Sequence, residues 1–359
     1  MKFLDNVVKD LKKAGIEDGS SEPPRYWFST GNYVLNKISS GNFRRGIPQG
    51  RVTGLAGPSG SGKSFLAANI IKTAQKEGAY VVVLDSENAL DDEFVSAVGA
   101  DPTTDYKYYD VDTTSQAKKV VSTFVTAYNK EYQGDHDAPR ILIVIDSLDM
   151  LETETESENT KKGITKGDQG QRNKQLKAML RGFVQIIKRS NISIVVTCQV
   201  YENQDVLNGE GRWIVSGGIK FALSTIILLT KLKLKETGSR EVKGIRMKCE
   251  GYKTRFTKPY QTVTIEVPYD EGMDPYNGLL AVAVEMGIVD KRGSRYALAG
   301  DDKTWYSSEF GGVASEVLIE AEARSEKFLE GFLENDEEEA GPDSEDSVKK
   351  RRTKNAQDK

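Results

Sequence analysis

The segment GPSGSGKS has the residue types and the spacing of a phosphate-binding loop. Its glycines let backbone N–H groups turn toward an anion, and the start of the following helix adds partial positive charge. A strand-like run, RVTGLA, precedes the loop, and an amphipathic helical pattern follows it. We therefore predict a nucleotide site rather than a glycine-rich turn without a ligand. The predicted binding residues are Gly57, Pro58, Ser59, Gly60, Ser61, Gly62, Lys63 and Ser64.

Two further carboxylates could complete such a site. Asp146 ends the apolar run in RILIVIDSLDML, where it could bind Mg²⁺ together with Ser64; a simple cap is the alternative. Asp149, one turn later, is expected to begin a helix. Glu87, in VVVLDSENALDDEF, could position a water molecule for hydrolysis, although a helix-starting acid fits its spacing as well. Lys63 would reach the β- and γ-phosphates.

The elements that must position these residues alternate along the chain. Helix-like segments fill most of the gaps between runs of β-prone residues. This alternation predicts an α/β fold with a mostly parallel twisted sheet, whose ligands bind beyond the carboxyl ends of the strands. The region from Ile245 to Val267 suggests further strands near a sheet edge. The predicted core strands are Val52–Ala56, Tyr80–Leu84, Tyr106–Val111, Ile141–Ile145, Ile192–Thr197 and Thr225–Leu229.

Composition divides the chain further. The run LLAVAVEMGIV reads as a helix that ends at Gly287, inside a small C-terminal unit. Glu334–Asp346 contains eight acidic residues and no basic one, and a basic segment with KKRR follows, a composition typical of disorder. We expect an N-terminal helix and strand at 1–28, a core at 29–269, a C-terminal unit at 270–333 and a disordered tail at 334–359.

Charge and cysteine content exclude several classes of protein. Residues 1–333 contain 44 basic and 45 acidic residues, so net charge neither favours nor excludes a nucleic-acid partner. Cys198 and Cys249 lack the paired spacing of a metal or redox motif, and we expect two reduced core thiols. His136, in GDHDAP, reads as a solvated loop residue rather than a catalytic base. The start is unlike a signal peptide and the apolar runs are too short for a bilayer, so we expect no membrane partner.

The order of these motifs resembles that of bacterial RecA recombinases. FSTGNYVLNKISSGNFRRGIPQGRVTGLAGPSGSGKS is followed by LDSENALDDEF, IDS, a strand that ends in glutamine, and SGGIKFALS. The segments CEGYKTRF and YDEGMDPYNGLL most resemble the UvsX recombinases of T-even-type bacteriophages. The resemblance spans about Trp27 to Arg295. It implies a RecA-like P-loop ATPase core with an N-terminal polymerisation arm, and ATP with Mg²⁺ as cofactors.

The resemblance also implies an activity. Such a protein would form a helical filament on single-stranded DNA, pair it with homologous duplex DNA, exchange strands and hydrolyse ATP to release them. Recombination, repair and recombination-dependent replication, mediator and single-strand-binding partner proteins, and a host bacterial cytoplasm follow from the same likeness. The alternatives are a hexameric RecA-fold helicase or clock-type ATPase, and a nucleotide-gated filament or mediator protein with little turnover.

Several site residues take their roles from this family. The resemblance implies that Glu87 activates water and that Asp91 and Phe94 contact and stack on adenine; a helix cap and a core phenylalanine are their alternatives. The remaining two roles lie further along the chain. Gln199 would sense the γ-phosphate. Lys253 and Arg255 would reach the γ-phosphate of the neighbouring subunit, unless they are solvated charges on an edge strand.

Two segments correspond to the family's DNA-binding loops, residues 152–172 and 200–218. The acidic first half of the former is a poor match for phosphate, which argues against close backbone contact there. Basic side chains near these loops could grip phosphates or form a solvated helix face, and Trp213 could stack on bases or fold back onto the protein. The predicted DNA-binding residues are Lys166, Arg172, Lys174, Arg181, Arg212, Trp213, Gly217 and Gly218.

Both ends of the chain allow two interpretations. The amphipathic N-terminal helix, followed by RYWFSTG, fits the family's arm that docks on an adjacent protomer, or it covers its own core. The acidic tail could compete with DNA for basic loops, or it could serve solubility alone.

Overall fold

The computed structural model describes residues 2–14, 23–132, 134–164, 170–202, 213–235, 242–269 and 271–325. The predicted tail at 334–359 lies outside these residues, and so do two of the predicted DNA-binding residues, Lys166 and Arg212. The predictions for these parts of the chain therefore stay predictions.

Eight strands form the main sheet, in the order β12-β11-β10-β3-β7-β6-β4-β5. Neighbours from β10 to β5 run parallel, whereas β11 pairs antiparallel with both β10 and β12. The predicted α/β class with a mostly parallel sheet is confirmed. The strands are β3 (Val52–Ala56), β4 (Tyr80–Asp85), β5 (Tyr106–Asp110), β6 (Ile141–Asp146), β7 (Ile192–Cys198), β10 (Thr225–Lys235), β11 (Val242–Lys253) and β12 (Thr262–Pro268).

Strand β10 is longer than its sequence pattern predicted. Residues Thr225–Leu228 pair with β3 at the centre of the sheet, which explains their continuous apolar character. Beyond them the alternation of lysine and leucine continues the strand as a two-stranded extension with β11. Lys231 and Lys233 are exposed there and can stay in water, and Leu232, between them on the opposite face, is exposed as well.

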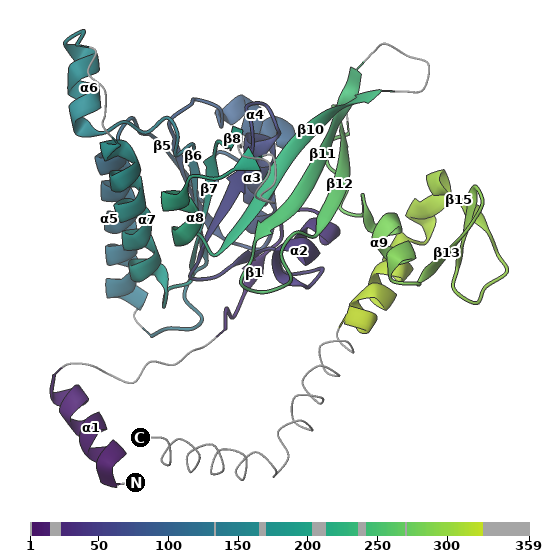
Figure 1. Ribbon diagram of the computed structural model, residues 1–359, viewed down its shortest axis with the longest axis horizontal. Coiled ribbons are helices and arrows are strands. Elements are labelled where there is room, and N and C mark those ends of the chain that lie inside the picture. Colours follow the sequence, from purple (N-terminus) through teal and green to yellow (C-terminus); the bar gives the residue numbers. More distant parts are fainter. Residues whose placement is uncertain are drawn as a thin grey trace, which may run out of the picture.

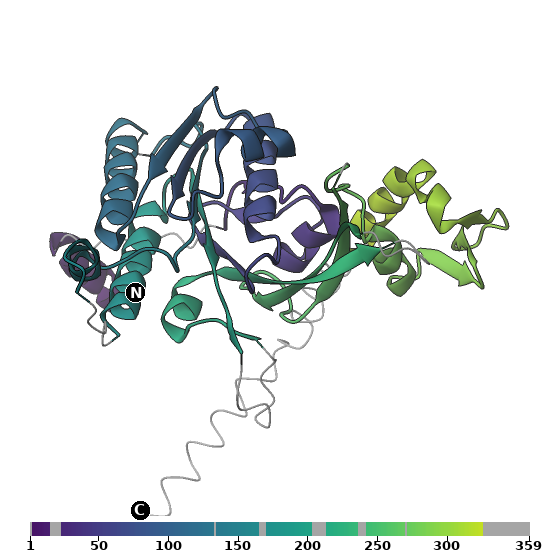
Figure 2. The ribbon, with the colours of Figure 1, turned by 90° about the horizontal axis from the view of Figure 1, so that it is seen from above.

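Helices cover both faces of the sheet (Figures 1 and 2). On one face lie α2 (Tyr33–Ser40), α3 (Lys63–Lys76) and α4 (Asp92–Val98), and on the other lie α5 (Thr114–Tyr132), α7 (Gln171–Ile187) and α8 (Gly217–Ala222). Successive side chains of β4 point to opposite faces of the sheet. Val81 and Val83 therefore pack in the first core, while Val82 and Leu84 pack in the second. The strand ends are thereby held rigidly from two sides.

The N-terminal helix α1 (Lys2–Lys13) contributes no residue to either buried core. Its side chains Phe3 and Leu4 are 76% and 65% exposed, and the helix lies apart from the sheet in Figure 1. The alternative that the arm covers its own core is therefore wrong for α1, but it holds for the segment after it, because Phe28 is fully buried in the first core. The short strand β1 (Trp27–Phe28) pairs with β2 (Ile47–Pro48) of the same chain.

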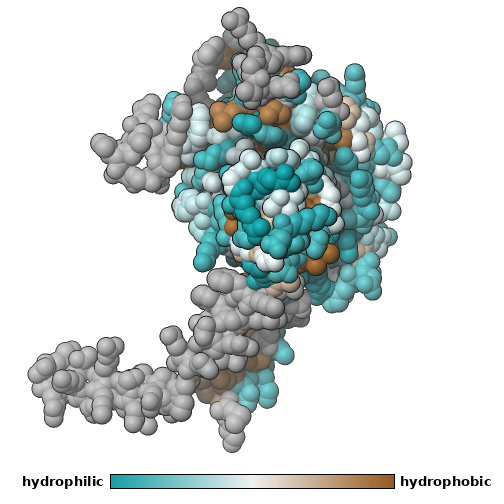
Figure 3. Space-filling view, turned by 90° about the vertical axis from the view of Figure 1, so that its right-hand side faces the viewer, coloured by the Kyte–Doolittle hydropathy of each residue, from teal (hydrophilic) through white to brown (hydrophobic). Residues whose placement is uncertain are grey.

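The C-terminal unit adds a helix and a small antiparallel sheet. It comprises α9 (Leu279–Glu285), β13 (Val289–Arg292), β14 (Arg295–Leu298), β15 (Trp305–Tyr306), the 3₁₀ helix Ser307–Gly312 and a helix over 314–325. An Arg44–Glu322 ion pair links it to the segment after α2, and its Trp305 is buried in the first core. Its outer face is mostly hydrophilic (Figure 3). Among the described residues, no helix has the length and apolarity needed to cross a membrane.

Both cysteines lie in the strands of the core, as predicted. Cys198 and Cys249 are free and fully buried, and burial raises the pKa of each thiol to about 12. Because the thiolate is the reactive form, we expect almost no labelling of the native chain by a thiol reagent at pH 8, and labelling of both residues in denaturant. Rapid labelling without denaturant would contradict this packing.

Candidate functional site

The loop Gly57–Ser64 joins β3 to α3 and wraps around the side chain of Lys63. The Lys63 Nζ donates hydrogen bonds to the carbonyls of Gly57 (3.0 Å) and Pro58 (3.2 Å). Gly62, with φ of +97°, precedes the helix, and no side chain caps its first N–H groups. At Gly57 a Cβ atom would lie 2.4 Å from the Leu229 carbonyl oxygen, so no other residue fits there. The loop thus presents uncapped backbone donors and one ammonium group, as a phosphate ligand requires.

Asp146 lies at the carboxyl end of β6, close to Ser64. Its carboxylate accepts a hydrogen bond from the Thr197 hydroxyl, while its second oxygen, Oδ2, is buried without a partner in the described residues. Burial raises the pKa of Asp146, and the Thr197 and Ser64 hydroxyls partly offset this rise. An orphaned carboxylate oxygen beside a serine hydroxyl fits a hard cation such as Mg²⁺. The described residues hold no cluster of three acidic, histidine or cysteine ligands, so water and phosphate oxygens would supply the other ligands.

The turn after β4 is organised by Asp85, a role that the sequence did not reveal. The buried carboxylate of Asp85 accepts hydrogen bonds from the backbone N–H groups of Glu87 (2.9 Å) and Leu90 (2.8 Å). The Glu87 side chain in turn accepts a hydrogen bond from the Ser147 hydroxyl (2.5 Å), next to Asp146. Glu87 is exposed and stands outside any helix, so the interpretation as a helix-starting acid is wrong.

Helix α4 begins after Asp91, whose carboxylate accepts a hydrogen bond from the Phe94 N–H (2.7 Å). Asp91 is therefore the helix cap that the sequence offered as an alternative. Phe94 is half-buried against the first core, which leaves part of its ring exposed. Adenine contact by Asp91 and Phe94 stays a prediction.

Asp149 does not begin a helix, contrary to the sequence-based expectation. The next helix, α6 (Glu154–Lys161), starts later and has Thr153 as its cap. Asp149 lies instead beside the end of β7, where its carboxylate accepts a hydrogen bond from the backbone N–H of Gln199. Burial raises the pKa of Asp149, and this donor, Arg172 and Lys63 partly offset the rise. The adjacency of β6 and β7 brings these two residues together.

The segment predicted as the first DNA loop contains helix α6. Glu156 accepts a hydrogen bond from the backbone of Thr153, and Glu154 accepts one from the Thr113 hydroxyl. The acidic residues in the first half of this segment therefore cap helix α6 and attach it to the start of α5. At the start of α7, the Arg172 Nε donates a hydrogen bond to the Leu151 carbonyl (3.0 Å).

The remaining described cations predicted to bind DNA are Lys174 and Arg181. Both lie on α7, beyond Arg172, and both are exposed. Their side chains are therefore accessible to a ligand. The same exposure fits the alternative of a solvated helix face, so DNA contact stays a prediction.

The described part of the second loop leads into a small hairpin and then α8. In this hairpin β8 (Tyr201–Glu202) pairs antiparallel with β9 (Trp213–Ile214). Trp213 is half-buried and packs against the second core, as in the folded-back alternative. Gly217 and Gly218 begin α8, and a Cβ atom at Gly218 would contact Lys177 of α7 at 3.5 Å.

Lys253 and Arg255 differ in their surroundings. The Lys253 Nζ donates hydrogen bonds to the carbonyls of Lys220 (2.6 Å) and Leu223 (2.7 Å) at the end of α8. Burial lowers the pKa of Lys253, and the nearby charges of Arg255 and Lys220 lower it further. Arg255 is exposed. The alternative of solvated charges therefore describes Arg255 but not Lys253.

Comparisons with known proteins show which family has this sequence. The family model for the RecA N-terminal domain matches residues 12–274. The chain belongs to the RecA family. It is 30% identical over 255 residues to the protein RecA of Thermus aquaticus, covering 70% of each chain. It is 28% identical over 308 residues to the protein RecA of Staphylococcus carnosus, covering 84% of this chain and 81% of that one. The RecA resemblance is thus confirmed, and the family match covers the strands that carry the P-loop, Asp146 and Gln199.

Proposed function

We propose that this RecA-family chain is an ATP-dependent homologous recombinase that forms a filament on single-stranded DNA and exchanges strands with homologous duplex DNA. One observation carries the proposal. Strand β7 lies between β3, which leads into the P-loop, and β6, which ends in Asp146. Gln199 directly follows β7 and leads into the second loop. A change at the nucleotide can therefore reach the DNA loop through one rigid strand.

We propose the residue roles on the basis of the RecA resemblance together with this geometry. Lys63 and the uncapped N–H groups of the loop would hold ATP phosphates, and Ser64 with Asp146 would hold Mg²⁺. Bound Mg²⁺ would neutralise charge on the β- and γ-phosphates. Glu87 would orient the attacking water, with its carboxylate held by Ser147. Gln199 would sense the γ-phosphate.

The surfaces of the chain support assembly. The apolar side of α1, which is exposed, would dock on an adjacent protomer, and Arg255 with Lys253 would face that neighbour's γ-phosphate. Single-stranded DNA would contact Lys174, Arg181 and the loops beside them. We propose a UvsX-type phage recombinase acting in the host cytoplasm in recombination, repair and recombination-dependent replication, with mediator and single-strand-binding partners, on the basis of CEGYKTRF and YDEGMDPYNGLL.

The test is ATP hydrolysis by the purified chain with and without single-stranded DNA, at saturating Mg²⁺. Strong stimulation by DNA, together with strand exchange between a circular single strand and a homologous linear duplex, is the expected result. Equal ATP turnover with and without DNA would contradict the proposed coupling between the nucleotide site and the second DNA loop. A closed ring in electron micrographs would favour a helicase-like ATPase instead.

We expect Asp149→Ala to weaken the coupling between DNA and ATP hydrolysis. The substitution removes the carboxylate that accepts the hydrogen bond from the exposed Gln199 N–H, an interaction worth about 1.5 kcal/mol. The concentration of single-stranded DNA that gives half-maximal ATPase rate should rise about tenfold, while the DNA-independent rate stays within twofold. Asp149→Asn keeps an acceptor oxygen and should restore most of the coupling. Equal behaviour of the two variants would contradict a positioning role.

A further inference from the structure

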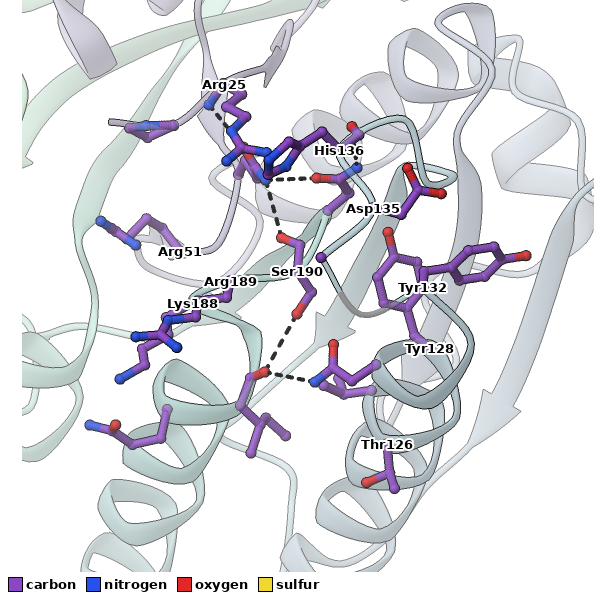
Figure 4. Close-up of a pocket in the computed structure, with 18 of the residues that line it drawn as sticks. Arg25, Arg51, Thr126, Tyr128, Tyr132, Asp135, His136, Lys188, Arg189 and Ser190 are labelled. Carbon is purple, nitrogen blue, oxygen red and sulfur yellow. Dashed lines mark hydrogen bonds between the residues drawn. The ribbon is translucent and has the colours of Figure 1, made fainter. Parts of the chain in front are cut away.

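A cavity of about 720 Å³ lies at the opposite end of the sheet from the P-loop. It is lined by residues that precede two central strands, Arg51 before β3 and Asn191 before β7, whereas the P-loop follows β3. The last turns of α5 and α7 and residues 23–25 complete its walls (Figure 4). None of the roles proposed above involves this cavity.

The floor of the cavity is a network of satisfied hydrogen bonds. The Gln49 Nε2 donates to the Asn191 Oδ1 (2.7 Å), and the Asn191 Nδ2 donates to the Ala138 carbonyl (2.9 Å). The Tyr128 hydroxyl donates to the Pro139 carbonyl (3.0 Å). Because Asn191 and Tyr128 are buried, this network fixes the shape of the floor before any ligand arrives.

Positive charge gathers on one wall. Figure 4 shows Arg51, Lys188 and Arg189 on one side of the cavity, and Tyr128, Tyr132 and Asp135 on the other. Lys188 and Arg189 are exposed and form no ion pair with any residue that the structure describes. Arg25 and His136 add further basic groups to the lining.

The acidic residue in the described lining, Asp135, does not neutralise this wall. Its carboxylate accepts a hydrogen bond from the Asp137 N–H (2.9 Å) and lies on the tyrosine side. The local excess of cations stands out because residues 1–333 are nearly neutral overall. Such a wall favours an anion, and arginine favours phosphate in particular.

We propose that this cavity is a second nucleotide-binding site, separate from the P-loop. The phosphate groups of one nucleotide unit would lie on the wall of Arg51, Lys188 and Arg189. The base would lie against Tyr132, whose half-buried ring stands 5.1 Å from that of Tyr128. A volume of about 720 Å³ suits a ligand of this size. The nucleotide unit can come from a free nucleotide or from a nucleic-acid strand.

The experiment compares two double variants of the full chain. Lys188→Glu with Arg189→Glu reverses charge in the cavity. Lys118→Glu with Lys119→Glu makes the same charge change on an exposed part of α5 outside the cavity lining. Equilibrium dialysis counts bound ADP per chain, and anisotropy of a labelled oligothymidylate measures strand affinity at several salt concentrations. The intact P-loop in every variant keeps its own ADP, which separates the two sites.

Either of two results supports the proposal. For a free nucleotide, the wild type and the control bind a second ADP that the cavity variant loses. For a strand, ADP binding is equal in all three, but the cavity variant binds oligothymidylate about tenfold more weakly with a salt slope smaller by about 1–2. The proposal would be overturned if the two double variants had equal effects both on the number of bound ADP molecules and on the affinity for oligothymidylate. Arg51→Gln, on the same wall, decides the question if the cavity variant does not fold.

Discussion

Replacing Glu87 by glutamine is expected to lower kcat for DNA-stimulated ATP hydrolysis by about 10²- to 10⁴-fold. Glutamine keeps the shape of the side chain and can still accept the Ser147 hydrogen bond, but it cannot take a proton from water. Binding of ATP and of single-stranded DNA should be unchanged, because Glu87 is exposed and holds no part of the core. The measurement is steady-state hydrolysis beside filter binding of ATP.

Glu93→Gln provides the matched control for this substitution. Glu93 is an exposed acid in the first turn of α4, a few residues further along the same segment. Its variant should hydrolyse ATP within twofold of the wild type. If Glu87→Gln also kept wild-type turnover, another group would have to position the water, and the role proposed for Glu87 would be wrong.

Replacing Arg255 by alanine is the second substitution with a large expected effect. An exposed cation that reaches a neighbour's γ-phosphate stabilises transition-state charge only after assembly, and such cations contribute on the order of 10³-fold to turnover. We therefore expect a comparable fall in kcat, with filaments still visible by electron microscopy. Lys248→Ala, which changes an exposed lysine on strand β11 just before Arg255 in the chain, is the control and should keep its activity.

Mixing the variants Arg255→Ala and Glu87→Gln tests whether the cation acts in trans. Each variant supplies what the other lacks, so roughly a quarter of the interfaces in a random mixed filament are complete. Hydrolysis by the mixture should exceed the sum of the separate rates. A mixture no more active than its components would mean that Arg255 acts within its own subunit or only in folding.

Lys253 cannot be tested as cleanly as Arg255. Its ammonium group holds the last carbonyls of α8, so Lys253→Ala would loosen that helix as well as remove a charge. A loss of activity in this variant would therefore mix two causes. The same contact connects the end of β11 to the helix that follows the second loop.

Local patterns in the sequence determined the phosphate loop, the buried strands and the fold class. The glycines and Lys63 of GPSGSGKS specify a phosphate loop, because few other patterns let a strand turn into a helix around an anion. Continuous apolar runs such as Ile141–Ile145 specify strands buried on both faces, and hence a sheet covered by helices. Asp146 could be placed at a strand end for the same reason. These features depend on residues that are neighbours along the chain.

Only the tertiary structure decided which strand ends meet. Asp149 looked like the start of a helix, yet it accepts the Gln199 N–H because β6 and β7 are adjacent in the sheet. Ser147 holds Glu87 because β4 lies on the other side of β6. Lys253 reaches α8 from a strand about thirty residues later. Strand order and the contacts that follow from it depend on long-range packing, which short patterns of residue type do not encode.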